Sequence, residues 1–197
     1  MLVYQGGTYD QPSNPGYSFL YNFFSDLGLT VAYSREPNTL SWLIFTFAVS
    51  IIGLGLVIFY FAWIDLFREN SQLFMFSRIG SVFGIVSGLA FIGVAFTPAD
   101  LLLDPHILFV RIGFLGTFIA AFFYFYCIIK HDNYPRRYAH SLAIFTVIVF
   151  IYLILLFFGP SAETSEGLFI QVTGQKLIVY IMAISYSIQG YGAYKIH

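Results

Sequence analysis

Charged residues are scarce in this chain, and cysteine is almost absent. Asp, Glu, Lys and Arg make up 10% of the 197 residues, whereas soluble domains usually carry about 25%. So few charges cannot cover the surface of a water-soluble fold, so that class is excluded. The single cysteine, Cys127, excludes an internal disulfide and any metal site built from several cysteines. The net charge of −1 gives no reason to expect nucleic acid as a partner.

Neither a signal peptide nor an internal repeat is visible in the sequence. Met1 is followed by Leu-Val-Tyr-Gln-Gly-Gly, with neither a basic region nor an adequate apolar stretch. Paired halves or matched interrupted segments, the usual sequence signature of a secondary transporter, are not visible. We therefore expect a single-domain protein that is not a transporter. Residues 1–39 would form an extracytoplasmic loop with an interfacial aromatic segment, and residues 40–197 a helical bundle.

Apolar residues are what the chain has in abundance, at 58% of its length. A run of roughly 20 apolar residues suffices for a helix to cross a bilayer. Five such runs predict an all-α, polytopic transmembrane bundle, and the short connections predict that neighbouring helices are antiparallel. The expected spans are about Leu40–Ile64, Phe74–Phe96, Pro105–Ile129, Ser141–Phe158 and Leu168–Ala193.

Basic residues predict how the bundle is oriented, because Lys and Arg accumulate on the cytoplasmic side. One end of the bundle would hold Arg68, Arg78, Lys130, Arg136, Arg137 and Lys195. The other end would hold only Arg35, Arg111 and Lys176. We therefore expect a multi-pass protein of the cytoplasmic (inner) membrane, with the N-terminal segment outside and the C-terminus in the cytoplasm.

An external N-terminus followed by five spans requires the N-terminal segment to cross the membrane without a signal peptide. Two explanations stay open. A sixth span belongs before Met1, or a short N-terminal tail is translocated by itself.

The second expected span carries glycines at four-residue spacing, namely Gly80, Gly84 and Gly88. Small residues at this spacing let the backbone of another helix approach closely. The third span, with Gly113 and Gly116, is a plausible partner. We expect this contact to lie within the chain, and a contact between chains is the alternative.

The stretch NPGYSFLYNFFSDLG, residues 14–28, mixes aromatic residues with polar ones and is too short to span a bilayer. Its aromatic part suits a segment that lies on the outer interface or dips into the bundle, with Gly28 ending it. Asp26 then stands in an apolar setting and needs water, a hydrogen-bond donor or a cation.

Polar residues expected at the same end of the bundle form the candidate ligand-binding set: Asp26, Arg35, Asn38, Asp100, His106, Arg111 and Lys176. The basic members would bind an anionic group, and lipid headgroups are the obvious candidates at this depth. The alternative is that these charges only cap helix ends and fix their register.

Ser25, Asp26 and His106 are the ingredients of a hydrolase triad, which geometry rather than chain order defines. The chain has neither a nucleophile-elbow motif nor a glycine-rich oxyanion loop. Asp26, Asp100 and His106 are able to ligate one ion together, but nothing in their spacing requires it. No metal site and no cofactor is therefore predicted, and whether the protein is an enzyme stays open.

The segments GYSFLYNFFSDLG, REPNTLSWLIFTFAVSIIGLGL, GLAFIGVAFTPADLLLDPHILFVRIGF and EGLFIQVTGQKLIVY resemble a prokaryotic membrane family called domain of unknown function nine hundred and ninety-eight. That family is similar in outline to the eukaryotic Frag and DRAM membrane proteins, some of which are linked to lipid remodelling and autophagy. The resemblance covers nearly the whole chain. It implies a six-helix bundle and so favours a further span before Met1.

The resemblance also implies that a polar signature gathers on one face of the protein. The matching residues are Ser25, Asp26, Gly28, Asn38, Pro98, Asp100 and His106. The family has no agreed reaction, so the match gives a location for function without a mechanism. In the last span, where an arginine or similar residue is expected, this chain has Gln171, Gln175 and Lys176.

The leading hypothesis from the sequence is a membrane protein with an external polar pocket at interface level, which binds a lipid headgroup or a related amphiphile. The aromatic stretch would be its lid or collar. One alternative is an accessory subunit that packs inside a larger membrane complex through the glycines of the second span. Another is an interfacial lipid hydrolase.

Overall fold

The computed structural model describes residues 1–196 and contains, over those residues, five long α-helices and no named strand. The helices are α1 (Thr39–Trp63), α2 (Ser71–Phe96), α3 (Leu103–Lys130), α4 (Arg136–Phe158) and α5 (Ser165–Ile196). Two short 3₁₀ helices accompany them, η1 (Phe24–Gly28) before α1 and η2 (Ile64–Phe67) directly after it. All five long helices are long and apolar enough to cross a membrane, which confirms the predicted all-α transmembrane class.

The helices begin and end within a few residues of the predicted spans, and most of them extend slightly beyond. α2 starts at Ser71 because the Asn70 side chain accepts hydrogen bonds from the N–H groups of Gln72 and Leu73. α4 starts directly after Pro135, whose fixed φ suits the residue before a helix. Both helix-start signals, an asparagine and a proline, lie outside the apolar runs, so an estimate from hydropathy alone places the helix starts too far inward.

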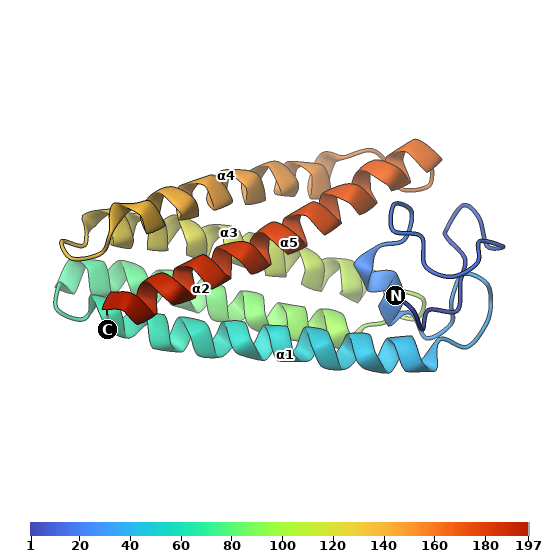
Figure 1. Ribbon diagram of the computed structural model, residues 1–197, viewed down its shortest axis with the longest axis horizontal. Coiled ribbons are helices and arrows are strands. Elements are labelled where there is room, and N and C mark those ends of the chain that lie inside the picture. Colours follow the sequence, from blue (N-terminus) through green and yellow to red (C-terminus); the bar gives the residue numbers. More distant parts are fainter. Residues whose placement is uncertain (197) are drawn as a thin grey trace.

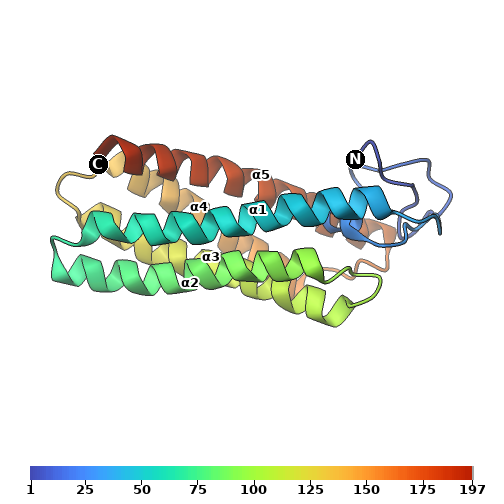
Figure 2. The same cartoon turned by 90° about the horizontal axis from the view of Figure 1, so that it is seen from below.

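The helices pack in chain order, each against the next, and neighbours run antiparallel (Figures 1 and 2). The closing contact, between α1 and α5, is different. Figure 1 shows α5 crossing the bundle obliquely, far from α1 at the end that carries residues 1–38 and nearer to it at the C-terminus. We call the first end the capped end and the second the C-terminal end. At the capped end η1 contacts both α1 and α5.

The glycines of α2 pack against other helices of the same chain. A Cβ at Gly88 would lie 2.6 Å from the carbonyl oxygen of Gly53 in α1, and one at Gly84 would clash with the ring of Tyr60. Gly80 faces α3 instead, where a Cβ would lie 3.0 Å from the ring of Tyr124. The α2 glycines therefore bring α2 against both of its neighbours, as small residues do between membrane helices.

Polar side chains inside the bundle hydrogen-bond to one another across helices. Ser81 of α2 lies 2.6 Å from the Tyr124 hydroxyl of α3 and donates to the carbonyl of Tyr60. The Tyr60 hydroxyl in turn lies 2.8 Å from that of Tyr186 in α5. Because a hydrocarbon interior offers no water, such groups must find partners within the protein. The Tyr60–Tyr186 bond also gives α5 a polar link to α1.

Residues 1–38, the opening segment, form a folded cap of turns over one end of the bundle. Gly7 has a φ of +84°, and a Cβ there would lie 2.5 Å from the backbone nitrogen of Ser34, so only glycine fits this crossing of two loops. η1 sits on the start of α1, where the Ser41 hydroxyl donates to the carbonyl of Leu27 at 2.9 Å. The opening segment is thus folded against the start of α1.

Candidate functional site

Lys176 of α5 reaches out of the bundle into the opening segment. Its side chain is buried, with 3% of the residue exposed, and its ammonium donates to the carbonyl of Asn22. The rings of Tyr17, Phe19 and Phe24 surround the ammonium at 5.3, 5.1 and 5.2 Å. Aromatic faces attract a cation at such distances, and more strongly where water is excluded. A single lysine thereby fixes three aromatic residues of the opening segment.

Asp26 is buried in the same region. Its carboxylate accepts from the Asn22 side-chain amide at 3.0 Å and from the N–H of Phe23 at 2.9 Å. No ion pair of Asp26 within 4 Å is present among residues 1–196. Burial raises the pKa of Asp26 to about 7, although these two hydrogen bonds and the positive charge of Lys176 oppose the rise.

Asn22 joins these two charged residues, although it is not among the site residues predicted from the sequence. It is fully buried. Its amide donates to Asp26 and to the carbonyl of Gly7, its side-chain oxygen accepts from the N–H of Ser18, and its backbone carbonyl accepts from Lys176. The one signal in the sequence is its position, four residues before Asp26, where a turn brings the two side chains together.

Gln175 provides the second tie between α5 and the opening segment. Its side-chain oxygen accepts from the N–H of Phe24 at 2.7 Å. Gln175 and Lys176 are consecutive residues, so one turn of α5 holds both Phe24 and Asn22. η1 therefore lies between α1 and α5 at the capped end, where the two helices diverge.

Beneath η1 lies an apolar cavity of about 280 Å³. Phe24 and Ser25 of η1 line it together with residues of α1, α2, α3 and α5, while α4 takes no part. The helical residues are Phe45, Val49, Ile52, Phe91, Val94, Val110, Phe114, Gln175, Val179 and Met182. Ser25 and Gln175 are the two polar residues of this lining, and they come from neighbouring elements at the capped end.

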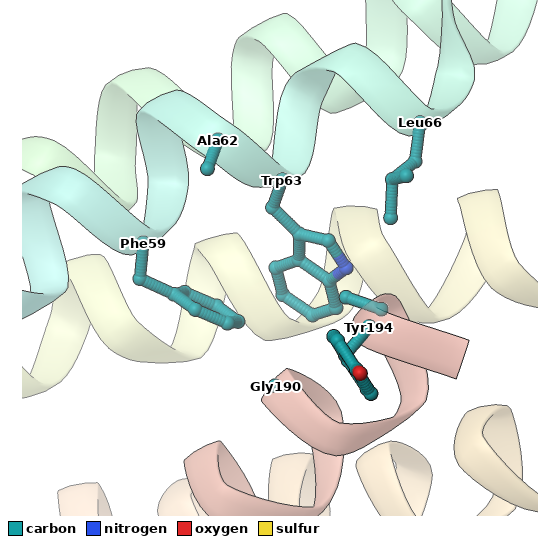
Figure 3. Close-up of a pocket in the computed structure, with 7 residues that line it drawn as sticks. Phe59, Ala62, Trp63, Leu66, Gly190 and Tyr194 are labelled. Carbon is teal, nitrogen blue, oxygen red and sulfur yellow. The ribbon is translucent and has the colours of Figure 1, made fainter. Parts of the chain in front are cut away.

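A second cavity, of about 420 Å³, lies between α1 and α5 at the C-terminal end (Figure 3). Phe59 and Trp63 line it from α1, and Gly190 and Tyr194 from α5. The contacts of Tyr186 with Phe59 and Tyr60 lie between the two cavities. The interface between α1 and α5 therefore contains a cavity at each end and is closed near its middle.

The other predicted ligand residues occupy separate places. Asp100 accepts from the backbone N–H groups of Thr30 and Val31, so it holds the loop before α1. The His106 Nδ1 donates to the carbonyl of Thr97 at 2.7 Å. The Arg111 guanidinium stacks over the ring of Phe157 at 5.2 Å.

Arg35 and Asn38 both belong to the turn that leads into α1. Arg35 is exposed and has a φ of +70°. The buried amide of Asn38 donates to the carbonyl of Leu29 at 2.9 Å. Among residues 1–196, neither Arg35 nor Arg111 forms an ion pair with Asp26. The candidate set is thus divided, with only Lys176 beside Asp26.

We predict that Asp100→Ala loosens the loop before α1. The carboxylate accepts two backbone N–H bonds and one from the Thr30 hydroxyl; bonds to a charged acceptor are worth about 1.5–3 kcal/mol, and less here because water competes at this exposed site. Amide hydrogen exchange over residues 29–38 should become at least several-fold faster. Asp104→Ala is the matched control, because Asp104 is an exposed carboxylate nearby. Equal exchange in both variants would contradict the assignment.

The triad residues do not form a relay in this structure. Asp26 bonds to Asn22 and Phe23, and His106 bonds to Thr97. Ser25 lines the apolar cavity instead of contributing to either group of bonds. Within the part of the chain that the structure describes, no group of three or more His, Cys, Asp and Glu residues is arranged to hold a metal ion.

Residues 1–185 match the model of the family described as "Protein of unknown function (DUF998)". No curated protein and no solved structure matches the chain.

Proposed function

This chain belongs to the DUF998 family of proteins of unknown function, and from the geometry of its site we propose that it binds a membrane lipid or a related amphiphile. The hydrocarbon part would occupy the cavity between η1, α1, α2, α3 and α5. The polar part would lie at the capped end, at the level of the membrane interface.

The observation that carries this proposal is the cavity beneath η1. Ten of its twelve lining residues are apolar, and its two polar residues lie at the capped end. Ligand pockets are typically apolar with a few polar groups that fix orientation. An elongated amphiphile has this same division into a long apolar part and a polar end. The volume of about 280 Å³ is close to the lower limit of roughly 300 Å³ for small-molecule pockets.

The opening segment would act as the lid of this cavity. Phe24 and Ser25 form part of the cavity wall, while the next residue, Asp26, is buried in the cap. Two consecutive residues of α5 hold this segment in place, Gln175 through Phe24 and Lys176 through Asn22. Movement of η1 would therefore change access to the cavity.

The distribution of basic residues supports an orientation with the capped end outside the cytoplasmic membrane. The loops and helix ends at the C-terminal end carry Arg68, Arg78, Lys130, Arg136, Arg137 and Lys195. Lys and Arg are retained on the cytoplasmic side. A ligand would then enter the cavity from the outer leaflet.

The accessory-subunit alternative loses its main support, because Gly84 and Gly88 pack against α1 of the same chain. The hydrolase alternative is not favoured either, because Asp26 and His106 bond to separate partners and Ser25 lines the apolar cavity. Lipid binding is the function with a specific observation behind it.

Val179→Trp should abolish retention of a co-purified lipid. Val179 lines the cavity from α5, and an indole in its place would fill much of the space that a hydrocarbon chain needs. Native mass spectrometry of protein extracted gently from its own membrane would measure lipid occupancy, with an expected loss of at least tenfold.

Val147→Trp is the matched control for this experiment. Val147 is 58% exposed on α4, and α4 takes no part in the cavity. The control should retain lipid as the unaltered protein does. Equal occupancy in the two variants would overturn the proposal, and a partner protein retained without lipid would favour the subunit alternative.

A further inference from the structure

The polar mouth of the cavity restricts the kind of amphiphile that fits. Resting on the lipid-binding function proposed above, we infer that the ligand is an uncharged, single-chain acyl lipid whose carbonyl oxygen accepts hydrogen bonds from Ser25 and Gln175. A monoacylglycerol represents this class. This differs from the anionic headgroup that the basic residues of the sequence predict.

The hydrogen-bonding groups at the mouth are neutral donors. The side-chain oxygen of Gln175 is already engaged by the N–H of Phe24, so its amide NH₂ is the part left for a ligand. Ser25 lines the cavity, and its hydroxyl can turn toward a bound molecule. An amide NH₂ and a hydroxyl together can donate to one carbonyl oxygen, which has two lone pairs.

Charge argues against an anionic headgroup at this mouth. None of the twelve lining residues is charged. Lys176 points toward three aromatic rings and donates to Asn22, and the buried Asp26 directly follows Ser25. A phosphate drawn into this position would lose water without gaining a cation, which is unfavourable.

The basic residues predicted to bind an anion lie elsewhere. Arg111 stacks on Phe157, a residue that does not line the cavity. Arg35 is exposed in the turn before α1. The cavity therefore offers hydrogen-bond donors at its mouth and apolar contacts below the mouth, but no positive charge that would match an anionic headgroup.

Three lipids with one hydrocarbon chain separate these requirements. 1-Oleoylglycerol has the ester carbonyl and no charge, 1-oleoyl-lysophosphatidic acid adds an anionic phosphate, and 1-O-oleylglycerol replaces the ester by an ether without a carbonyl. Each would be added at equal concentration to lipid-depleted protein in detergent, and occupancy would be read by native mass spectrometry. We expect 1-oleoylglycerol to bind at least tenfold more tightly than either analogue.

Two substitutions test the named donors. Ser25→Ala removes the hydroxyl, and Gln175→Glu keeps an acceptor for Phe24 while replacing the NH₂ donor by an oxygen. Ser25→Ala should weaken 1-oleoylglycerol binding by about two- to tenfold, the range expected for one neutral hydrogen bond. Gln175→Glu should weaken it by at least as much, because the new carboxylate oxygen also repels the carbonyl oxygen of the ligand. Ser187→Ala is the control, because that hydroxyl donates to a carbonyl of its own helix, and it should change nothing.

The outcomes distinguish this inference from the function on which it rests. If lysophosphatidic acid binds as tightly as 1-oleoylglycerol and Val179→Trp blocks both, the cavity binds lipid but the inferred class is wrong. If Val179→Trp leaves all binding unchanged, the proposed function fails as well. The comparison of the three lipids on the unaltered protein decides between the lipid classes even if a variant does not fold.

Discussion

Gly53→Leu should prevent the bundle from folding stably, because α1 and α2 touch through their backbones at this position. A Cβ at Gly53 would lie 2.5 Å from the carbonyl oxygen of Gly88, and a Cβ at Gly88 would lie 2.6 Å from that of Gly53. Neither carbonyl can turn away without breaking its own helix. Adding volume to a packed core costs about 1–3 kcal/mol and sometimes more. We expect this variant at or above that range, because two helix axes must separate.

Gly55→Leu is a matched control from the same helix, only two residues away. A Cβ at Gly55 would meet no atom within 4 Å, so a leucine there would project into open space. The midpoint of thermal unfolding in detergent should fall sharply for Gly53→Leu and stay within a few degrees for Gly55→Leu. A similar midpoint for the two variants would contradict the backbone contact between α1 and α2.

The second large effect is a dependence of stability on pH that originates at Asp26. Burial raises the pKa of Asp26 from an ordinary value of 3.8 to about 7. The folded cap therefore binds a proton more tightly than the unfolded chain does. Its stabilising contribution is fully present below pH 4 and is lost as the pH rises to about 7. The full shift corresponds to about 4 kcal/mol.

Several groups face Asp26 and set the size of this effect. Lys176 of α5 lowers the pKa of Asp26 through its positive charge, as do the hydrogen bonds from Asn22 and Phe23. Tyr4, Tyr17 and Tyr33 of the opening segment have pKa values raised chiefly by burial and also by the charge of Asp26. These phenols stay neutral over the range in question, so they do not reverse the trend.

Asp26→Asn should remove this pH dependence while keeping the shape of the side chain. The amide oxygen of asparagine can accept the bonds from Asn22 and Phe23 and carries no charge. Unfolding would be followed from pH 4.5 to 7.5. The unaltered protein should lose stability relative to Asp26→Asn as the pH rises. Asp104→Asn, at an exposed carboxylate, should behave like the unaltered protein, and a parallel profile for Asp26→Asn would exclude Asp26 as the source.

The sequence is sufficient for the transmembrane helices because their physical signal is strong and local. Each span is a long apolar run, and a bilayer accepts such a run only as a helix. The spacing of Gly80, Gly84 and Gly88 also indicates close packing. It does not indicate that Gly80 faces α3 while Gly84 and Gly88 face α1, because that depends on how α2 is rotated between its neighbours.

Only part of the candidate site can be predicted from the sequence. Asp26 and Lys176 both stand out as charged residues in an apolar setting, and the structure places them in one buried cluster. Asn22 does not stand out, because a neutral side chain in an aromatic stretch carries no such signal. The cavity is not predictable either, since residues from five separate elements line it and the course of α5 determines whether they enclose space.

The packing of the helices in chain order has a consequence for the assembly of the protein. α2 to α5 can each dock on the helix made just before, but the bonds of α5 to Tyr60 and Asn22 join residues 126 and 154 positions apart. The opening segment is synthesised before α1, yet its ties to Gln175 and Lys176 form only when α5 has been made and inserted. A ribosome stalled before α5 would therefore carry an intermediate that contains α1 to α4 and whose opening segment is still accessible to protease.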